Sequence, residues 1–420
     1  MRTFRLTALL ACALAVPLAW SQTAPAPAAA ASAPAGLTVR PELRTFLLDA
    51  QALINEKKFP QAKEKLNAAN AITDKTPVES YLTARVGLAA AIGEDDATNA
   101  ALLLEQILKL NATGAWLKPE EKLAMMQGVG IAHYRVKDYA QAASWMDRNV
   151  EAGGTDQSVK DVRIQSYLLI GNFSRANELL NDEMAASEKA QRTPPLRHLQ
   201  MMAQARHKLK DIPGYTQALE WMVQHYPSKE SWQALVNRLW SRSDLATRLQ
   251  LDVLRLSFFT TTPEEQSDYA DYIDFAQKAG LSSEALSIFD KGVAAGLLAT
   301  GPKAEADKKL RAKLAQETEQ DRKTVAADTA AALKKPDGLA LFNLGLNLVG
   351  TQQYDKGIEL MEKGIAKGMA KRPEDARLRL AVVYAQAGQT DKALKTFATV
   401  SGPEGLTELA RYWTWAIRKT

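Results

Sequence analysis

The chain has 420 residues, with 53 lysine and arginine residues against 48 aspartate and glutamate residues, so its formal net charge at pH 7 is +5. Charges of both signs are interspersed along the chain, which argues against the concentrated basic face that nucleic acid or an anionic membrane requires. Helix-favouring residues dominate and strand patterns are almost absent, so the composition indicates an all-α protein.

The first 21 residues have the three parts of a secretory signal peptide. Arg2 and Arg5 form a basic head, residues 6–20 are apolar, and Ala19–Ser21 supplies the small residues that a signal peptidase reads. We therefore predict export to the periplasm with cleavage after Ser21. The alternative is a lipoprotein signal with a cut before Cys12. Because Cys12 is the only cysteine, cleavage after Ser21 would leave a mature chain without disulfide or thiol chemistry.

The following segment, Gln22–Gly36, is rich in alanine and proline and carries no charge, which predicts a disordered tether. Helical periodicity then continues to the end of the chain, without a transmembrane segment in the mature protein. We divide it into four parts: an N-terminal degenerate array of helical hairpins at 37–227, central helical hairpins at 228–301, a charged helical segment at 302–336, and a C-terminal repeat pair with a capping helix at 337–420.

The N-terminal array is marked by alanines at loosely regular intervals, which are compatible with a degenerate repeat but exclude a strict one of 34 residues. Ser228–Phe259 is helical without a hairpin signature. Lys303–Lys335 predicts one long exposed helix, or two, with a thin apolar stripe. Glu404–Lys419 is apolar on one side, as a terminal cap would be. The spaced alanines are Ala62, Ala100, Ala142, Ala176 and Ala218.

Leu341–Val400 contains the clearest repeat. Two copies of one pattern place Gly345 and Ala381 36 residues apart, and Gly357 and Ala393 at the same interval. Small residues at these positions predict two helices in close approach. The unit resembles the tetratricopeptide repeat, a helical hairpin of about 34 residues. The resemblance implies a right-handed α-solenoid of such hairpins, in which each unit needs its neighbours to bury its apolar faces.

A narrower resemblance is carried by four segments. Tyr226–Trp232, Phe275–Leu298, the charged helix, and Tyr354–Ile358 followed by Lys371–Ala376 are similar to exported tetratricopeptide proteins of Gram-negative bacteria, some of them described as components of TonB energy-transduction systems. This resemblance implies a non-catalytic periplasmic scaffold that binds proteins, with TonB-complex components as candidate partners. A chaperone or adaptor in the assembly of the cell envelope or of outer-membrane proteins is the alternative.

Candidate catalytic or ligand-binding patterns are weak. The four histidines (133, 198, 207 and 225) form no zinc-binding pair, and Gly128 and Gly130 lack the rest of a dinucleotide loop. The acidic stripe Asp268, Asp271 and Asp274 fits a solvated helix face better than a metal site. Trp413 fits the cap core better than a ligand site. We therefore predict no enzyme activity, no cofactor and no metal.

The tetratricopeptide resemblance also implies which residues line a groove. Asn343 and Arg379 match in type the residues with which some of these repeats clamp a peptide carboxylate, but Phe342, Leu346 and Asp375 replace the others. We therefore predict an apolar groove with two polar fixing points, suited to a helix or an extended apolar peptide. The alternative is that Phe342 and Leu346 only pack against the next repeat. The predicted partner-binding residues are Leu339, Phe342, Asn343, Leu346, Val349 and Arg379.

Overall fold

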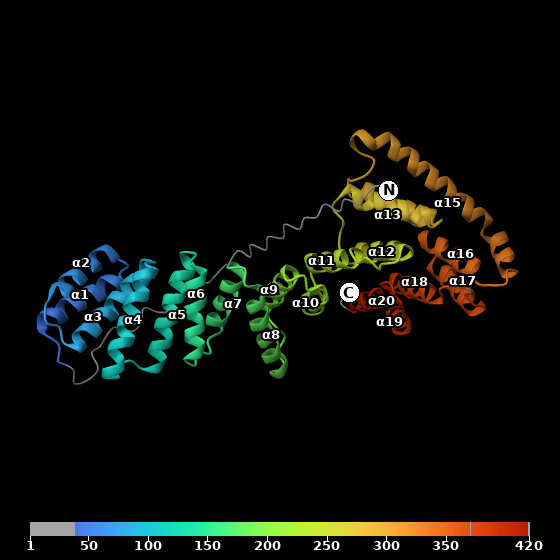
Figure 1. Ribbon diagram of the computed structural model, residues 1–420. Helices are drawn as coiled ribbons and strands as arrows, with labels where there is room; N and C mark the ends of the chain where they lie inside the picture. Colours follow the sequence, from blue (N-terminus) through green and yellow to red (C-terminus); the bar gives the residue numbers. More distant parts are fainter. Residues whose placement is uncertain (1–37, 370, 419–420) are drawn as a thin grey trace. The chain divides into compact units, whose positions relative to one another are not determined.

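The structure, a computed structural model, describes residues 38–369 and 371–418, and every regular element in these ranges is a helix (Figure 1). It consists of two compact units, one ending at Ala186 and the other beginning at Ser187, so the division falls in the last turn of α8 (Phe173–Lys189). The predicted signal peptide and tether, residues 1–36, lie outside the described residues. The four-part division of the chain stays a prediction.

The first unit is a stack of helical hairpins in which each helix from α1 (Pro41–Asn55) to α7 (Gln157–Leu169) packs on its neighbours in sequence, and Lys160 of α7 donates to Glu183 of α8 at 2.8 Å. The larger of its hydrophobic clusters extends from Leu43 to Trp145 and is formed mainly by alanine and leucine side chains. The helices that pair are α1 with α2 (Phe59–Ala71), α3 (Pro77–Gly93) with α4 (Ala97–Gly114), α5 (Pro119–Arg135) with α6 (Tyr139–Glu151), and α7 with α8.

The second unit continues the same plan with two departures, a long helix between hairpins and a helix that returns to an earlier part of the unit. Its elements in order are α9 (Leu196–Lys208), α10 (Ile212–His225), α11 (Lys229–Trp240), η1 (Thr247–Leu249), α12 (Gln250–Thr260), α13 (Gln266–Lys278), α14 (Ser282–Ala294), η2 (Gly301–Lys303), α15 (Ala304–Leu333), α16 (Leu339–Gly350), α17 (Tyr354–Lys367), α18 (Pro373–Gln386), α19 (Thr390–Phe397) and α20 (Leu406–Ile417).

Eight hairpin turns among the described residues share one geometry. In each, a residue with positive φ follows the first helix, and the N–H of the next residue donates to a carbonyl five positions back. Asp95, for example, has φ 57°, and the Asp96 N–H donates to the Ala91 carbonyl at 2.9 Å. This is the Schellman arrangement, and the second helix always begins two residues after the positive-φ residue. These residues are Lys57, Asp95, Lys137, Gly171, Lys210, Gly280, Gln352 and Gly388.

The hairpin of α16 and α17 is held by direct backbone approach. A Cβ atom on Gly345 would lie 2.5 Å from the Gly357 carbonyl oxygen, and one on Gly357 would lie 2.8 Å from the Gly345 oxygen. In the next hairpin the corresponding Ala381 and Ala393 are fully buried. The interpretation of Gly345 and Gly357 as the crossing point of two helices is confirmed, and the burial of Ala381 and Ala393 agrees with the same role in the next hairpin.

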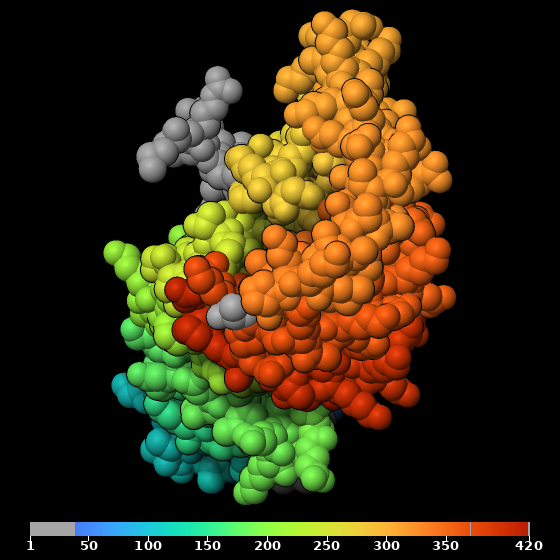
Figure 2. Space-filling model, turned by 90° about the vertical axis from the view of Figure 1, so that its right-hand side faces the viewer, coloured from blue at the N-terminus to red at the C-terminus, as the bar shows by residue number. Residues whose placement is uncertain are grey.

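The long helix α15 is an insertion between two hairpins that still touch each other. It packs on α14 and α16, and only Leu314 and Ala332 of its 30 residues are buried. Beneath it, the Ser283 hydroxyl donates to the Asn347 carbonyl oxygen at 2.7 Å, joining α14 directly to α16. Of the two predicted alternatives, one long exposed helix or two, the structure has one; Leu314 of the predicted stripe is buried, whereas Leu333 is 53% exposed. In Figure 2 the orange surface of α15 forms a ridge.

The C-terminal helix α20 packs against α18 and α19 and also against α12, more than 140 residues earlier. Trp413 is fully buried, with its ring centroid 4.9 Å from that of Phe259 on α12 and 6.1 Å from that of Phe397 on α19. The Ala246 N–H donates to the Glu404 carbonyl at 3.2 Å. The predicted cap is therefore confirmed, and it also closes the second unit upon itself.

Candidate functional site

The closure of the second unit surrounds a half-open cavity of about 320 Å³. Helices α12, α13, α14, α16, α17 and α18 all contribute to its lining. Its side chains fall into two groups, an apolar wall and a set of polar and charged residues that reaches the mouth. The apolar wall consists of Phe258, Phe259, Ile288, Leu346, Val349, Val382 and Val383.

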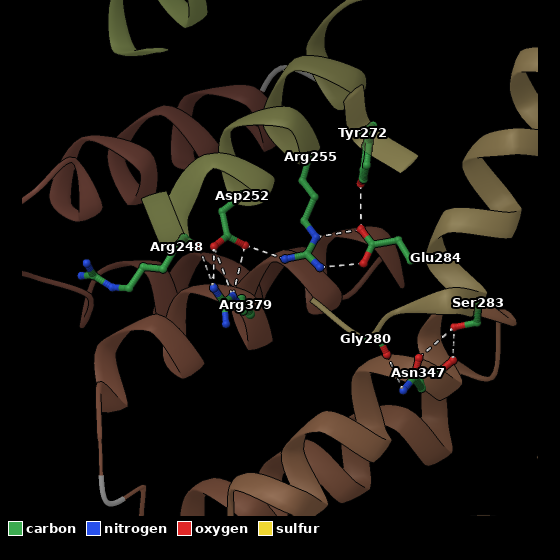
Figure 3. Close-up of polar contacts among 9 residues, drawn as sticks. All are labelled: Arg248, Asp252, Arg255, Tyr272, Gly280, Ser283, Glu284, Asn347 and Arg379. Atoms are coloured by element: carbon green, nitrogen blue, oxygen red, sulfur yellow. Dashed lines mark hydrogen bonds and ion pairs between the residues drawn. The ribbon is translucent and has the colours of Figure 1, made fainter. Parts of the chain in front are cut away.

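Charged side chains from three helices form a continuous row along the cavity (Figure 3). Arg379 donates from Nε and Nη2 to Asp252 at 3.1 and 3.0 Å, and Asp252 also accepts from Arg255. Arg255 in turn donates from Nε and Nη2 to Glu284 at 2.8 and 2.6 Å, and the Tyr272 hydroxyl donates to Glu284 at 2.8 Å. Each carboxylate therefore lies between two donors.

Asp252, Arg255 and Tyr272 of this row are buried, and burial together with the neighbouring charges sets the protonation states of Asp252 and Tyr272. Burial alone would raise the pKa of Asp252, but the charges of Arg379 and Arg255 outweigh it and hold the pKa below its ordinary value. Burial raises the pKa of Tyr272 well above its ordinary value, and Glu284 adds to the shift. Asp252 is therefore ionised and Tyr272 is a neutral donor near neutral pH.

Arg248 holds the first half of α18 through two contacts, one with Asp375 and one with Arg379. Arg248 donates to Asp375 at 2.7 Å and forms a further ion pair with Glu404. The Arg248 carbonyl oxygen also accepts a hydrogen bond from Arg379 Nη2 at 3.1 Å. Asp375, which the sequence places in the groove, is 6% exposed and serves this ion pair.

Two cationic groups of the cavity keep unused donors. Arg379 is 26% exposed at its side chain, and its Nη1 makes no hydrogen bond with the described part of the chain. Lys291 is an exposed residue of α14 at the cavity, and within residues 38–369 and 371–418 it has no ion-pair partner. Both are therefore available to an incoming group.

The structure brings three of the six predicted groove residues together. Leu346, Val349 and Arg379 line the cavity. Phe342 is 2% exposed, and its Cβ lies beside Gly364 of α17, the other helix of its own hairpin.

Leu339, at the start of α16, is 49% exposed, and Asn343 is also exposed; neither lines the cavity. Arg379 forms an ion pair with Asp252 of α12, so of the two predicted polar fixing points, Asn343 and Arg379, only Arg379 lies at the cavity. A partner-binding role for these six residues stays a prediction.

Sequence reasoning did not identify Asp252, Arg255, Tyr272, Glu284 or Lys291 as site residues. For Asp252 and Arg255 the sequence did contain a signal, within Ser228–Phe259, the segment without a hairpin signature. Asp252 and Arg255 interrupt an otherwise apolar run on α12 at a spacing of three residues, and they are 0% and 6% exposed. Buried charges of this kind require partners from elsewhere in the fold, although the run does not say which.

Other sequence candidates have packing roles. A Cβ on Gly128 would lie 2.8 Å from Ile92 Cδ1, and one on Gly130 would lie 2.7 Å from Met146 Cε, so both glycines permit close helix packing. His133 is buried with its Nδ1 3.1 Å from Asp138. Among the described residues, no group of three or more histidine, cysteine or acidic residues is placed to hold a metal ion.

No helix in the described part of the chain combines the length and apolar character needed to cross a membrane.

No protein-family model and no curated protein matches this chain. Solved structures that match include a tetratricopeptide repeat protein from Parabacteroides merdae, with 10% identity over 81% of this chain and 98% of that chain and a TM-score of 0.33. Naa15/Naa10 bound to HypK matches with 16% identity over 88% and 59% of the two chains and a TM-score of 0.31. The TPR2AB domain of yeast Sti1 in a pHSP90 complex matches with 14% identity over 70% and 98% and a TM-score of 0.25.

The TM-scores of these three matches are all below 0.5.

Proposed function

We propose that this protein is a non-catalytic, tetratricopeptide-type scaffold that holds a protein partner at the cavity of its second unit. The observation that carries the proposal is the cavity itself, where an apolar wall lies beside Arg379 and Lys291 with unused donors. Interfaces commonly combine a buried apolar anchor with a few polar groups that fix its orientation. Helical hairpins that stack on their neighbours suit this role because they present side chains from several helices on one surface.

We further propose that the scaffold acts in the periplasm, with components of a TonB-type complex as candidate partners. The support is the pattern of residues 1–21 and the resemblance of Tyr226–Trp232 and Tyr354–Ile358 to exported proteins. N-terminal sequencing of the protein from a periplasmic fraction tests the location. A mature chain that begins at Gln22 is expected, and a lipid-modified Cys12 at the N-terminus would overturn the predicted cleavage.

Site-specific photo-crosslinking in cells tests the cavity as the binding surface. A photoreactive residue at Gln386, an exposed residue that lines the cavity, should yield a discrete adduct with one partner. The same group at Lys356, an exposed residue of α17 that does not line the cavity, is the matched control. Equal adducts from both positions, or none from Gln386, would show that partners bind elsewhere.

Loss of the adduct in a chain that also carries Lys291→Glu would tie it to the cavity. Purification of the adduct and identification of the partner then decide between a TonB-type complex and the alternative, a chaperone or adaptor role in envelope assembly.

A further inference from the structure

The charges around the cavity do not balance. Three cations, Arg255, Lys291 and Arg379, lie in its lining. Two anions compensate part of this charge: Glu284, which lies in the lining, and Asp252, which bridges Arg255 and Arg379. The cavity therefore carries one positive charge in excess, beside apolar side chains.

The hydrogen bonds show where this excess is available. Arg255 donates to Asp252 and Glu284 through all three of its guanidinium nitrogens, and its side chain is 5% exposed. Both oxygens of Glu284 accept from Arg255 or Tyr272. The unused cationic donors in the described lining are therefore Arg379 Nη1 and the Lys291 ammonium group, and an anion is the group that complements their charge.

The buried row fixes the direction of Arg379. Its Nε and Nη2 are both held by Asp252, and Nη2 is also held by the Arg248 carbonyl, so the guanidinium plane has little freedom (Figure 3). A donor that is already oriented loses less conformational entropy when a ligand binds. Arg255, Glu284 and Tyr272 act behind it as positioning residues, since they hold Asp252 and the helices that carry it.

We propose that the cavity is a binding site for a carboxylate joined to an apolar group of the size of one or two amino-acid residues. The carboxylate binds to Arg379 Nη1 and Lys291, and the apolar group packs on Phe258, Val349 and Val382. A volume of about 320 Å³ is at the lower end of the range for small-molecule sites, which sets the size of the ligand. The carboxylate can come from a free small molecule or from an acidic side chain of a protein partner.

Ligand-observed NMR titration of the full chain tests this with two pairs of compounds. N-acetyl-leucine and its amide differ only in the charge of a terminal carboxylate. N-acetyl-glutamyl-leucine amide and N-acetyl-glutaminyl-leucine amide differ only in the charge of a side chain. In at least one pair the acid should bind about tenfold more tightly than the neutral compound. The pair that shows the difference identifies the source of the carboxylate.

The variants separate the cavity from the rest of the surface. Lys291→Gln removes an exposed cation and should weaken the acid about fivefold to tenfold without affecting the fold. Gln386→Trp should obstruct the mouth and weaken the acid and the amide alike. Lys356→Gln, which removes the same charge outside the cavity, should leave binding unchanged.

The proposal is wrong if acids and amides bind alike in both pairs, if no compound binds, or if Lys291→Gln and Lys356→Gln bind as the native chain does. It concerns the cavity of the proposed scaffold but needs no partner protein. If a partner protein occupies the cavity without a carboxylate, the acids and amides will bind alike, but the Gln386 crosslink will still form. The carboxylate proposal would then be wrong and the proposed scaffold function would stand.

Discussion

Arg379 and Asp252 form an ion pair across 127 residues of sequence, with 3.0 Å between Nη2 and Oδ2. Asp252 is completely buried, and Arg255 contacts its other oxygen. The pair joins α12 to α18, so it lies where the second unit closes and where its cavity begins. The same contact therefore contributes to the stability of the second unit and helps to shape the candidate site.

Asp252→Asn should destabilise the second unit strongly. The substitution leaves the buried cation Arg255 and the partly buried cation Arg379 without their shared anion, and breaking a buried ion pair from one side costs about 3–5 kcal/mol. Urea unfolding followed by circular dichroism measures the change. Asp244→Asn, whose ion pair with Arg242 lies at the surface, is the control and should have a much smaller effect. Equal unfolding midpoints for the two variants would show that the buried row adds no net stability.

Asp271→Asn should stabilise the protein, but only where the carboxyl group is ionised. Burial, with the nearby charges of Asp268 and Asp274, raises the pKa of Asp271 to about 6. Because this lies above the value of about 3.8 in an unfolded chain, folding favours the protonated form, and the ionised form opposes folding above about pH 6.

We expect Asp271→Asn to raise Tm at pH 8, and the gain to shrink as the pH falls through about 6 towards 4. Thermal melting at several pH values measures this. Asp355→Asn, an exposed change of equal charge on α17, is the control for the loss of one negative charge. A gain of constant size from pH 4 to pH 8 would mean that ionisation of Asp271 is not the cause.

Glu79→Gln should destabilise the first unit, which begins with α1. Glu79 is 1% exposed, accepts hydrogen bonds from Arg40 Nε and Nη2 at 3.0 and 2.9 Å, and forms a capping box with Thr76. The hydrogen bond from Arg40 lowers its pKa to about 2, against the effect of burial. A buried hydrogen bond to a charged group contributes about 2 kcal/mol, so a loss of this size is expected at pH 7.

The pH dependence of this loss has a defined sign. Because the pKa of Glu79 is lower in the folded state, its contribution is present above about pH 4.5 and is lost as the pH falls towards 2. The difference between the native chain and Glu79→Gln should therefore narrow over this interval in urea unfolding. Glu42→Gln, an exposed change in the first turn of α1, should have a small effect throughout. A difference in the free energy of unfolding that stays constant down to pH 2 would show that ionisation of Glu79 is not the source of the stabilisation.

Gly345→Ala should destabilise the hairpin of α16 and α17. The new Cβ would lie 2.5 Å from the Gly357 carbonyl oxygen, so the two helices must move apart, at a cost of about 1–3 kcal/mol. Gly87→Ala is the control, because that Cβ would meet only the flexible end of Leu103 at 3.3 Å and alanine favours the helix. If thermal melting shows no loss in Gly345→Ala, the helices of this hairpin do not cross at Gly345.

The elements and their pairing follow from local sequence, since a helix and its hairpin partner are specified within about 40 residues. Apolar periodicity identified the helices, and Gly345 with Gly357 identified a close crossing. The turns were harder to predict from the sequence, because five of the eight residues with positive φ are not glycine. At Lys57, Asp95 and Lys137 the Schellman hydrogen bonds stabilise a positive φ that the residue type does not predict.

Only the tertiary structure decided where the cavity lies and which residues form it. A helical period shows that Asp252, Arg255 and Arg379 each lie on a particular face, but it carries no information about which faces meet after 127 residues. That meeting depends on the small rotation between each pair of hairpins, on the insertion of α15, and on α20 packing Trp413 against α12. These effects accumulate along the unit, so the partner of Arg379 is determined by the sum of many contacts and by no single local pattern.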